Sequence, residues 1–302
     1  MSSAVEIEQV TKTFGAFTAV DALSLQIPKN TIYGFIGPNG SGKTTTLRMI
    51  MRIYLPDRGT VRVLGDASWH AASDRIAYLP EERGLYKKMK VRELLRFYAA
   101  LKSFRDSDRA ITEWLERMNL GPWAEKRIET LSKGMSQKVQ FIATVIAKPE
   151  LVLLDEPFSG LDPVNADVFR EAVLDLKRQG TTVIFSTHDM AAAERLCDFI
   201  FMIYKGKKVL DGTLDAIQNS YGNDTIAVRM AGAARLEGLP GVESVSDFGN
   251  HQELRLTKNA DPQRILALLM ERGPVQRFEQ TRPSLHDIFV RIAAPAPEEH
   301  HA

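Results

Sequence analysis

Eight consecutive residues carry the clearest chemical signal in the chain, Gly37-Pro38-Asn39-Gly40-Ser41-Gly42-Lys43-Thr44. They match the pattern G-x-x-x-x-G-K-[ST], a loop whose glycines let the backbone wrap closely around phosphate groups. Lys43 would reach the β- and γ-phosphates of a nucleotide, and the Thr44 hydroxyl would hold Mg²⁺. The N-terminus of a following helix would add partial positive charge. The pattern therefore predicts a phosphate-binding loop.

The residues on either side of this loop have the patterns that the motif requires. The apolar run Thr31 to Ile36 predicts a buried strand before the loop. Apolar residues spaced i, i+3, i+4 and i+7 predict a helix after it, at Leu47, Ile50, Met51 and Tyr54. This strand–loop–helix context favours the phosphate loop over a glycine-rich turn that matches by chance.

Two further groups of polar residues follow apolar runs that predict buried strands. Asp155 and Glu156 come directly after Leu151 to Leu154, and His188 follows the run Thr181 to Phe185. Adjacent carboxylates at the end of a buried strand are costly without a role, and ligands of open α/β sheets bind at this edge. We therefore expect all three side chains beside the phosphate loop, rather than in a solvated turn or on an inert surface.

Two helix starts also carry polar residues. Ser132 and Gly134 lie in the segment 131–136, which opens a long helix, and serine is an ordinary helix cap. Asp162 precedes Pro163, and this pair suits the cap and the first residue of the next helix. Between Val91 and Lys148 we expect a helix–helix core formed by two apolar helical faces. One face consists of Leu94, Leu95, Tyr98 and Leu101, and the other of Ile111, Trp114, Leu115 and Met118.

Composition narrows the classes of function. The 302 residues suffice for one large domain or two ordinary ones, and the net charge of +1 indicates no global attraction to nucleic acid or acidic lipid. Cys197 is the only cysteine, which excludes an intrachain disulfide and indicates a reducing compartment. We expect no signal peptide, and no run approaches the about 18 apolar residues of a membrane span. Any membrane role would therefore depend on a partner.

The two ends of the chain have their own patterns. Residues 4–27 alternate in polarity, which predicts half-buried antiparallel strands, and Phe14 in the turn between them is either a loop anchor or a stacking platform for a base. After Asn219, three strand patterns (225–230, 242–245 and 253–256) and two helix patterns (260–272 and 284–292) predict a small α+β domain of β-α-β-β-α-β order, with its boundary at 222–224. The tail 293–302 is expected to be disordered, and His300 and His301 are too few for a metal site.

The order of the motifs resembles that of the ATP-binding cassette (ABC) ATPases over about residues 4–215: 37–44, then 131–136, 151–156, 159–163 and 188. The resemblance implies an α/β fold with a P-loop NTPase sheet core, an antiparallel β subdomain and a helical signature subdomain. With the small C-terminal α+β domain, the expected division is an ATP-binding domain at 4–218, an accessory domain at 219–292 and the tail at 293–302. No chemical motif falls in the accessory domain, so we expect regulation, dimer stabilisation or simple packing there.

The same resemblance implies a head-to-tail dimer that binds two ATP molecules with Mg²⁺. Ser132 and Gly134 of one subunit would contact the γ-phosphate bound by the other, and Asp162 would couple the two sites. The implied catalytic residues are Lys43, Glu156 and His188, and the implied metal-binding residues are Thr44, Glu81 and Asp155. The implied ATP-binding residues are Phe14, Gly37, Pro38, Asn39, Gly40, Ser41, Gly42, Lys43, Thr44, Thr45, Ser132, Gly134 and Asp162.

Three positions depart from the family pattern. Lys133 and Met135 replace the second signature glycine and the glutamine, and Glu81 stands where the family has the glutamine of its Q-loop. A carboxylate keeps an oxygen for Mg²⁺ but loses the amide donor. The segments 79–86 and 283–289 look like a subgroup that energises bacterial sodium and drug exporters.

The expected function is therefore that of an ATPase subunit powering export through membrane-spanning permease subunits. It would act as a homodimer, in the cytoplasm at the inner face of the membrane, without binding nucleic acid. One alternative is an ABC ATPase that acts on ribosomes or DNA. It is disfavoured because the chain has a single cassette and no sustained heptads. A small-molecule kinase on the same loop would leave 131–136 and His188 unexplained.

Overall fold

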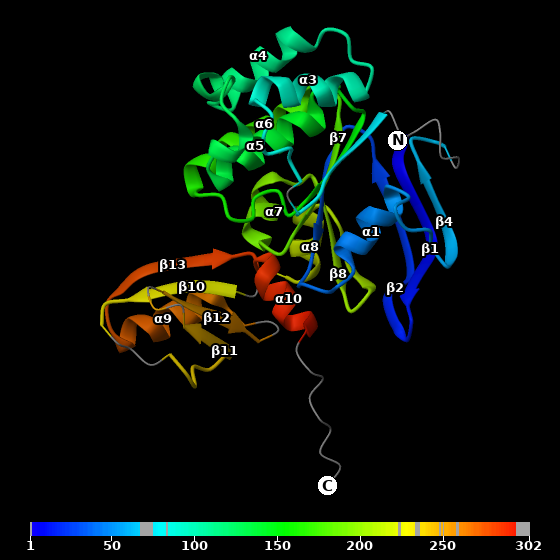
Figure 1. Ribbon diagram of the computed structural model, residues 1–302. Helices are drawn as coiled ribbons and strands as arrows, with labels where there is room; N and C mark the ends of the chain where they lie inside the picture. Colours follow the sequence, from blue (N-terminus) through cyan, green and yellow to red (C-terminus); the bar gives the residue numbers. More distant parts are fainter. Residues whose placement is uncertain are drawn as a thin grey trace. The chain divides into compact units, whose positions relative to one another are not determined.

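The computed structural model describes residues 2–66, 75–82, 84–222, 225–232, 236–247, 249, 251–257 and 260–293. Some predictions fall outside these residues. They concern Arg83, residues 223 and 224 of the expected boundary, and the tail beyond Ala293 with its two histidines. The chain forms two compact units, one ending at Thr213 and one beginning at Leu214 (Figure 1). The sequence led us to expect a division after residue 218.

A mostly parallel sheet forms the centre of the first unit. Among the described residues its strand order is β5-β6-β7-β3-β8-β9, and only β9 is antiparallel to its neighbour. The strands β3, β6 and β7 are buried along their whole length, as apolar runs in a sheet covered on both faces should be. Their bounds are β3 Ile32–Ile36, β5 Ile76–Leu79, β6 Leu151–Asp155, β7 Thr182–Thr187, β8 Phe199–Tyr204 and β9 Lys207–Gly212. The carboxyl ends of β3, β5, β6 and β7 share one edge, where the predicted polar residues follow.

An antiparallel sheet of order β2-β1-β4 packs with the central sheet around the first helix. The bounds are β1 Ser3–Phe14, β2 Phe17–Pro28, β4 Arg58–Val63 and α1 Lys43–Ile50. Helix α1 ends earlier than its apolar spacing predicted, so Met51 and Tyr54 lie beyond it. Arg52 adopts φ 54° and the Ile53 N–H donates to the Arg48 carbonyl at 2.8 Å, which closes the helix with a Schellman turn.

A helical subdomain connects β5 to β6 in the same unit, and α6 and α7 follow later in the chain. The bounds are α3 Val91–Leu101, α4 Ser107–Arg117, α5 Lys133–Val145, α6 Pro163–Arg178 and α7 Met190–Leu196, with single turns η2 at Gly121–Trp123 and η3 at Ile128–Thr130. The predicted helix–helix core is confirmed, since Leu94, Leu95, Ile111 and Leu115 are buried. Leu101 is exposed, and its prediction was wrong, because α3 ends there and the chain turns at Ser103 with φ 53°.

The second unit is a small antiparallel sheet with its own core. Its strand order is β11-β12-β10-β13 among the described residues, and Leu254, Ile265 and Leu269 lie in the core. The bounds are α8 Leu214–Ser220, β10 Thr225–Met230, β11 Val242–Asp247, β12 Gln252–Leu256, α9 Pro262–Arg272, β13 Val275–Thr281 and α10 Leu285–Ala293. The described residues between β10 and β11 contain no helix, unlike the predicted order, since Gly238, Pro240 and Gly241 interrupt that segment. Strand β13 was not recognised from the sequence.

No helix in the described part of the chain combines the length and the apolar character needed to cross a bilayer.

Candidate nucleotide site

The loop between β3 and α1 depends on glycine at two positions for both conformation and space. Gly37 has φ 148° and Gly42 has φ 112°, where other residues are strained. A Cβ on Gly37 would lie 2.2 Å from the Ile203 carbonyl oxygen, and one on Gly42 would lie 2.5 Å from the Ala19 carbonyl oxygen. The loop is therefore packed backbone against backbone on β8 and β2, which fixes the direction in which its N–H groups can point.

Lys43 is a buried cation held by this loop. The residue is 6% exposed, and its ammonium donates to the carbonyls of Gly37 at 2.7 Å and Pro38 at 3.1 Å. Burial lowers the pKa of Lys43, and the nearby Glu156 and Asp155 carboxylates oppose that shift. The Ser41 hydroxyl is also buried, without a hydrogen-bond partner among the described residues. A fixed cation, an unsatisfied hydroxyl and a helix N-terminus at one loop fit a phosphate chain.

Asp155 lies at the end of β6 and is oriented from three sides. It is 2% exposed and accepts hydrogen bonds from Thr44 Oγ1 at 3.1 Å, from the Tyr78 hydroxyl at 3.1 Å and from the Ser186 hydroxyl. Burial, with the nearby Asp155 carboxylate, raises the pKa of Tyr78 to about 12, so the phenol stays protonated and remains a donor. The structure thus joins Thr44 and Asp155, as expected, and adds Tyr78 and Ser186, which the sequence analysis missed.

Glu156 has an unusual backbone conformation. Its φ is 49°, in the left-handed region, and its N–H donates to the Ser186 hydroxyl at 3.1 Å and carbonyl at 3.2 Å. Its Oε1 atom lies 3.0 Å from His188 Nδ1 and 3.9 Å from Lys43 Nζ. Such conformations in non-glycine residues cost energy and cluster at functional sites. Here the turn directs a buried carboxylate between a cation and an imidazole, which suits a general base.

Glu81 lines a cavity together with Asp155, the last residue of β6, and Glu156, which follows it. The cavity has a volume of about 320 Å³, and its lining includes Glu81, Asp155, Glu156 and Lys133. Helix α5 supports its walls, since Gln137 donates to the Pro157 carbonyl at 2.5 Å and the Gln140 amide to the Glu82 carbonyl at 3.3 Å. These two glutamines were also missed, because amides inside a helix carry no motif.

The remaining predicted residues make local contacts within this one chain. Ser132 caps α5 by accepting from the Met135 N–H at 3.2 Å, and Asp162 caps α6 by accepting from the Asn165 N–H at 3.0 Å. A Cβ on Gly134 would lie 3.6 Å from the Leu161 side chain. The structure does not join these three residues to the phosphate loop by any hydrogen bond described within the chain.

Phe14 has features of both interpretations offered for it. Its ring meets Tyr54 edge-on, with the centroids 5.3 Å apart, and the Lys12 ammonium lies 5.6 Å from its centroid. It is nevertheless 43% exposed at the end of β1, directly before the turn to β2. A ring supported on one edge and open elsewhere can both anchor the turn and accept a stacked base.

Among the described residues no three His, Cys, Asp or Glu side chains are grouped so as to hold a metal by themselves. Magnesium does not require such a group, because it is commonly bound through one or two carboxylates together with substrate phosphates and water. Thr44, Asp155 and Glu81 supply a hydroxyl and two carboxylates close to the phosphate loop, a donor set that suits this cation.

Comparison with known proteins identifies the family. The family model described as ABC transporter matches residues 20–159. The uncharacterized ABC transporter ATP-binding protein YhaQ of Bacillus subtilis (strain 168) is 42% identical over 287 residues, which cover 94% of this chain and 96% of that protein. The chain belongs to the ABC transporter ATP-binding proteins. It is therefore an ABC-type ATPase, with a separate match of residues 212–293 to the C-terminal domain of DrrA1-3-like ATP-binding proteins.

Two further similarities bear on this ABC ATPase. The Nod factor export ATP-binding protein I of Paraburkholderia xenovorans (strain LB400) is 32% identical over 298 residues, 96% of this chain and 97% of that protein. A solved structure titled "Structure of ATP binding subunit of ABC transporter" has a TM-score of 0.68 at 28% identity, covering 73% of this chain and 94% of that chain. The predicted fold class, a P-loop core with an added C-terminal domain, is confirmed.

Proposed function

We propose that this ABC ATPase uses ATP with Mg²⁺ to power export of a substrate through a separate membrane permease, at the inner face of the cell membrane. The observation that carries the proposal is the cluster of Lys43, Glu156 and His188 beside the Thr44–Asp155 hydrogen bond. The export-type name of the Nod factor relative supports the direction of transport.

Lys43 would bind the β- and γ-phosphates. Its ammonium donates to the Gly37 and Pro38 carbonyls, which fixes it against the backbone of the loop. Ser41 adds a hydroxyl that has no other described partner. Charge aimed in advance at the transferring phosphoryl stabilises the transition state more than it stabilises the ground state.

Thr44, Asp155 and Glu81 would hold Mg²⁺, which neutralises charge on the phosphates. Asp155 is well placed because Tyr78 and Ser186 orient its carboxylate while Thr44 already contacts it. Glu81 lies on the wall of the same cavity.

Glu156 would accept the proton of the attacking water, and the resulting hydroxyl oxygen would attack the γ-phosphorus as the bond to ADP breaks. His188, 3.0 Å from the Glu156 carboxylate, would orient that water and contact the γ-phosphate. The closeness of Lys43 keeps the carboxylate paired until the substrate phosphates compete for the cation.

We further propose that Ser132 and Gly134 act on the ATP held by a second subunit, with Asp162 coupling the two sites. Both capped helices present N-terminal N–H groups, which favour an anion. The local contacts of Ser132 and Asp162 within one chain are compatible with a role that is completed only in a head-to-tail homodimer.

Affinity purification of the tagged protein from detergent-solubilised membranes, with partners identified by mass spectrometry, tests the transport proposal. We expect enrichment of a membrane-spanning permease. A matched purification of the Lys43→Ala protein controls for partners that require ATP. Recovery of ribosomes or DNA-bound complexes in place of a permease would overturn the proposal in favour of a non-transport ABC ATPase.

A further inference from the structure

Strand β13 is an edge strand of the sheet in the second unit. Its single neighbouring strand among the described residues is β10, and Gln276, Arg277 and Glu279 on β13 are exposed. The outward N–H and C=O groups of an edge strand can pair with a further strand. Backbone hydrogen bonds alone do not select a partner, so specific pairing at this edge requires a strand with complementary side chains.

The sequence of β13 matches itself in the antiparallel direction. The stretch Gln276-Arg277-Phe278-Glu279-Gln280 reads the same backwards except that arginine and glutamate exchange places. If two copies pair around a twofold axis at Phe278, each Arg277 faces the Glu279 of the other copy, which gives two opposite-charge pairs. Within one chain Arg277 Nε already donates to Glu279 Oε2 at 3.0 Å, so both charged groups lie on one face of the strand.

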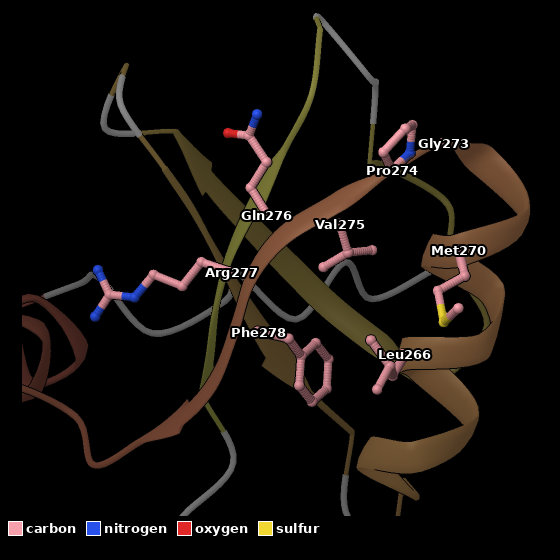
Figure 2. Close-up of a pocket in the computed structure, with 8 residues that line it drawn as sticks. All are labelled: Leu266, Met270, Gly273, Pro274, Val275, Gln276, Arg277 and Phe278. Carbon is pink, nitrogen blue, oxygen red and sulfur yellow. The ribbon is translucent and has the colours of Figure 1, made fainter.

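On the side of α9, β13 carries the apolar residues Val275 and Phe278, which are incompletely covered. A groove of about 530 Å³ lies between α9 and β13, and Figure 2 shows Leu266, Met270, Val275 and Phe278 around it, with Gln276 and Arg277 directed away. Met270 is 65% exposed. The twofold axis of an antiparallel strand pair is perpendicular to the sheet, so both α9 helices would lie on the same face of the joined sheet. Phe278 would then meet its own copy and extend the apolar layer across the axis.

The opposite edge of the sheet lacks this self-complementarity. Pairing of β11 with a second β11 around Val245 would place Glu243 opposite Asp247, so that like charges meet twice. The two edges therefore differ in the charge pattern that a second copy would encounter, and only β13 offers attraction.

We propose that two copies of this chain pair through β13, antiparallel and centred on Phe278, so that their four-stranded sheets become one. This interface is separate from the ATP-bound dimer proposed above and needs no nucleotide.

Sedimentation velocity of the full chain without ATP measures this association. The parent should dimerise reversibly. Arg277→Glu or Glu279→Arg should each raise the dimer dissociation constant about tenfold, because like charges then meet twice. The double variant should recover the parent value. Lys43→Ala should dimerise like the parent, since it affects only the nucleotide site.

Mixing the two single variants separates pairing between chains from pairing within a chain. Each single variant keeps like charges at 277 and 279 in its own strand, whereas a mixed dimer restores both opposite-charge pairs between strands. We expect the mixture to dimerise tenfold better than either variant alone. A parent that stays monomeric, or a mixture that behaves like its components while circular dichroism shows folded protein, would refute the proposal.

A cysteine cross-link tests the register. Phe278→Cys should give a covalent dimer with a short bismaleimide, because the residue lies on the axis. Ser246→Cys on β11 is the matched control and should not. The native Cys197 is half-buried, and desolvation raises the pKa of its thiol, so the background should be low. Cross-linking at position 246 but not at 278 would show that the copies pair through β11, and it would refute the proposal.

Discussion

At the scale of single residues, the site depends on side chains whose positions are fixed by neighbours that carry no motif. Tyr78 and Ser186 orient Asp155, and Ser186 also holds the backbone of Glu156. The motif residues were predictable because their types and spacing are dictated by phosphate chemistry. The supporting residues were not, because a tyrosine or serine in a buried strand has no distinctive spacing, and only the parallel strand order brings them to Asp155.

The first prediction concerns the fixed cation. Lys43→Ala should lower ATP turnover about 100-fold or more, because it removes charge aimed at the transferring phosphoryl and the buried cation that interacts with Asp155 and Glu156. A phosphate-release assay at saturating ATP measures it. Lys207→Ala, which changes an exposed lysine on β9, is the control. Turnover near the parent value in Lys43→Ala would argue against the phosphate-loop interpretation.

The second prediction concerns the base. Glu156→Gln keeps the shape of the side chain but cannot accept the proton, so hydrolysis should fall about 100-fold or more while ATP still binds. The ATP-loaded dimer should then accumulate, and size-exclusion chromatography with ATP and Mg²⁺ should show a shift from the nucleotide-free state. If this variant hydrolysed ATP like the parent, another group would be the base.

The third prediction concerns the departure at Glu81. If its oxygen serves Mg²⁺, Glu81→Gln should retain basal hydrolysis, whereas Glu81→Ala should weaken hydrolysis about tenfold, together with its stimulation by the permease. Titration of activity with Mg²⁺ should show a higher requirement in the alanine variant only. Full activity of Glu81→Ala would show that a different residue supplies the oxygen to Mg²⁺, and Glu82 would be the next to test.

At the scale of elements, buried parallel strands and capped helices were the most predictable features. An apolar run that must be covered on both faces, such as β6, is compatible with few structures other than a buried strand. The predictions that failed depend on local features of the chain. Helix α1 ends before its apolar spacing does, because Arg52 turns left-handed. Strand β13 escaped recognition because its exposed face carries Arg277 and Glu279 and an extra residue interrupts its pairing with β10, which breaks the period-2 pattern.

The fourth prediction concerns the tie between β1 and the start of β4. Asp57 accepts from the Thr13 N–H and hydroxyl, each at 2.7 Å, and from Lys12. The hydrogen bond from Lys12, followed by those from Thr13, lowers the pKa of Asp57 from 3.8 to about 2. The ionised form is thus favoured in the folded state, so this contribution to stability is present above pH 3.8 and is lost as pH falls toward 2.

Asp57→Asn should therefore unfold at a lower urea concentration than the parent at pH 7, and the gap should narrow at pH 3. Urea titrations followed by circular dichroism at both pH values measure this. A gap that stayed constant between the two pH values would show that the hydrogen-bond geometry of Asp57, not its charge, stabilises the tie.

At the scale of the whole molecule, the nucleotide motifs are confined to one of the two compact units. Every nucleotide motif lies in the unit that ends at Thr213, and the unit from Leu214 has its own core and no chemical motif. The sequence suggested this separation through a change of pattern after Asn219. It could not place α8, because a seven-residue helix has little periodicity and only its tertiary contacts assign it to the second unit.

The fifth prediction follows from this division. A truncated chain that ends at Thr213 should stay folded and bind ATP with an affinity similar to the parent, because no motif residue is removed. It should lose the nucleotide-free dimer and respond differently to the permease. Isothermal titration with a non-hydrolysable ATP analogue and sedimentation velocity measure the two properties. Complete loss of ATP binding in a folded truncation would mean that the second unit contributes to the site.

The left-handed backbone of Glu156 has a consequence for how this protein tolerates variation. Glycine and asparagine adopt φ near 49° at lower cost than glutamate, by about 1–2 kcal/mol for a residue with an ordinary side chain. If Glu156 is the general base, as proposed, its role in hydrolysis retains a residue that selection for stability alone would replace. A survey of variants scored by cellular abundance would favour small residues at this position, whereas a survey scored by growth under export demand would reject the same residues.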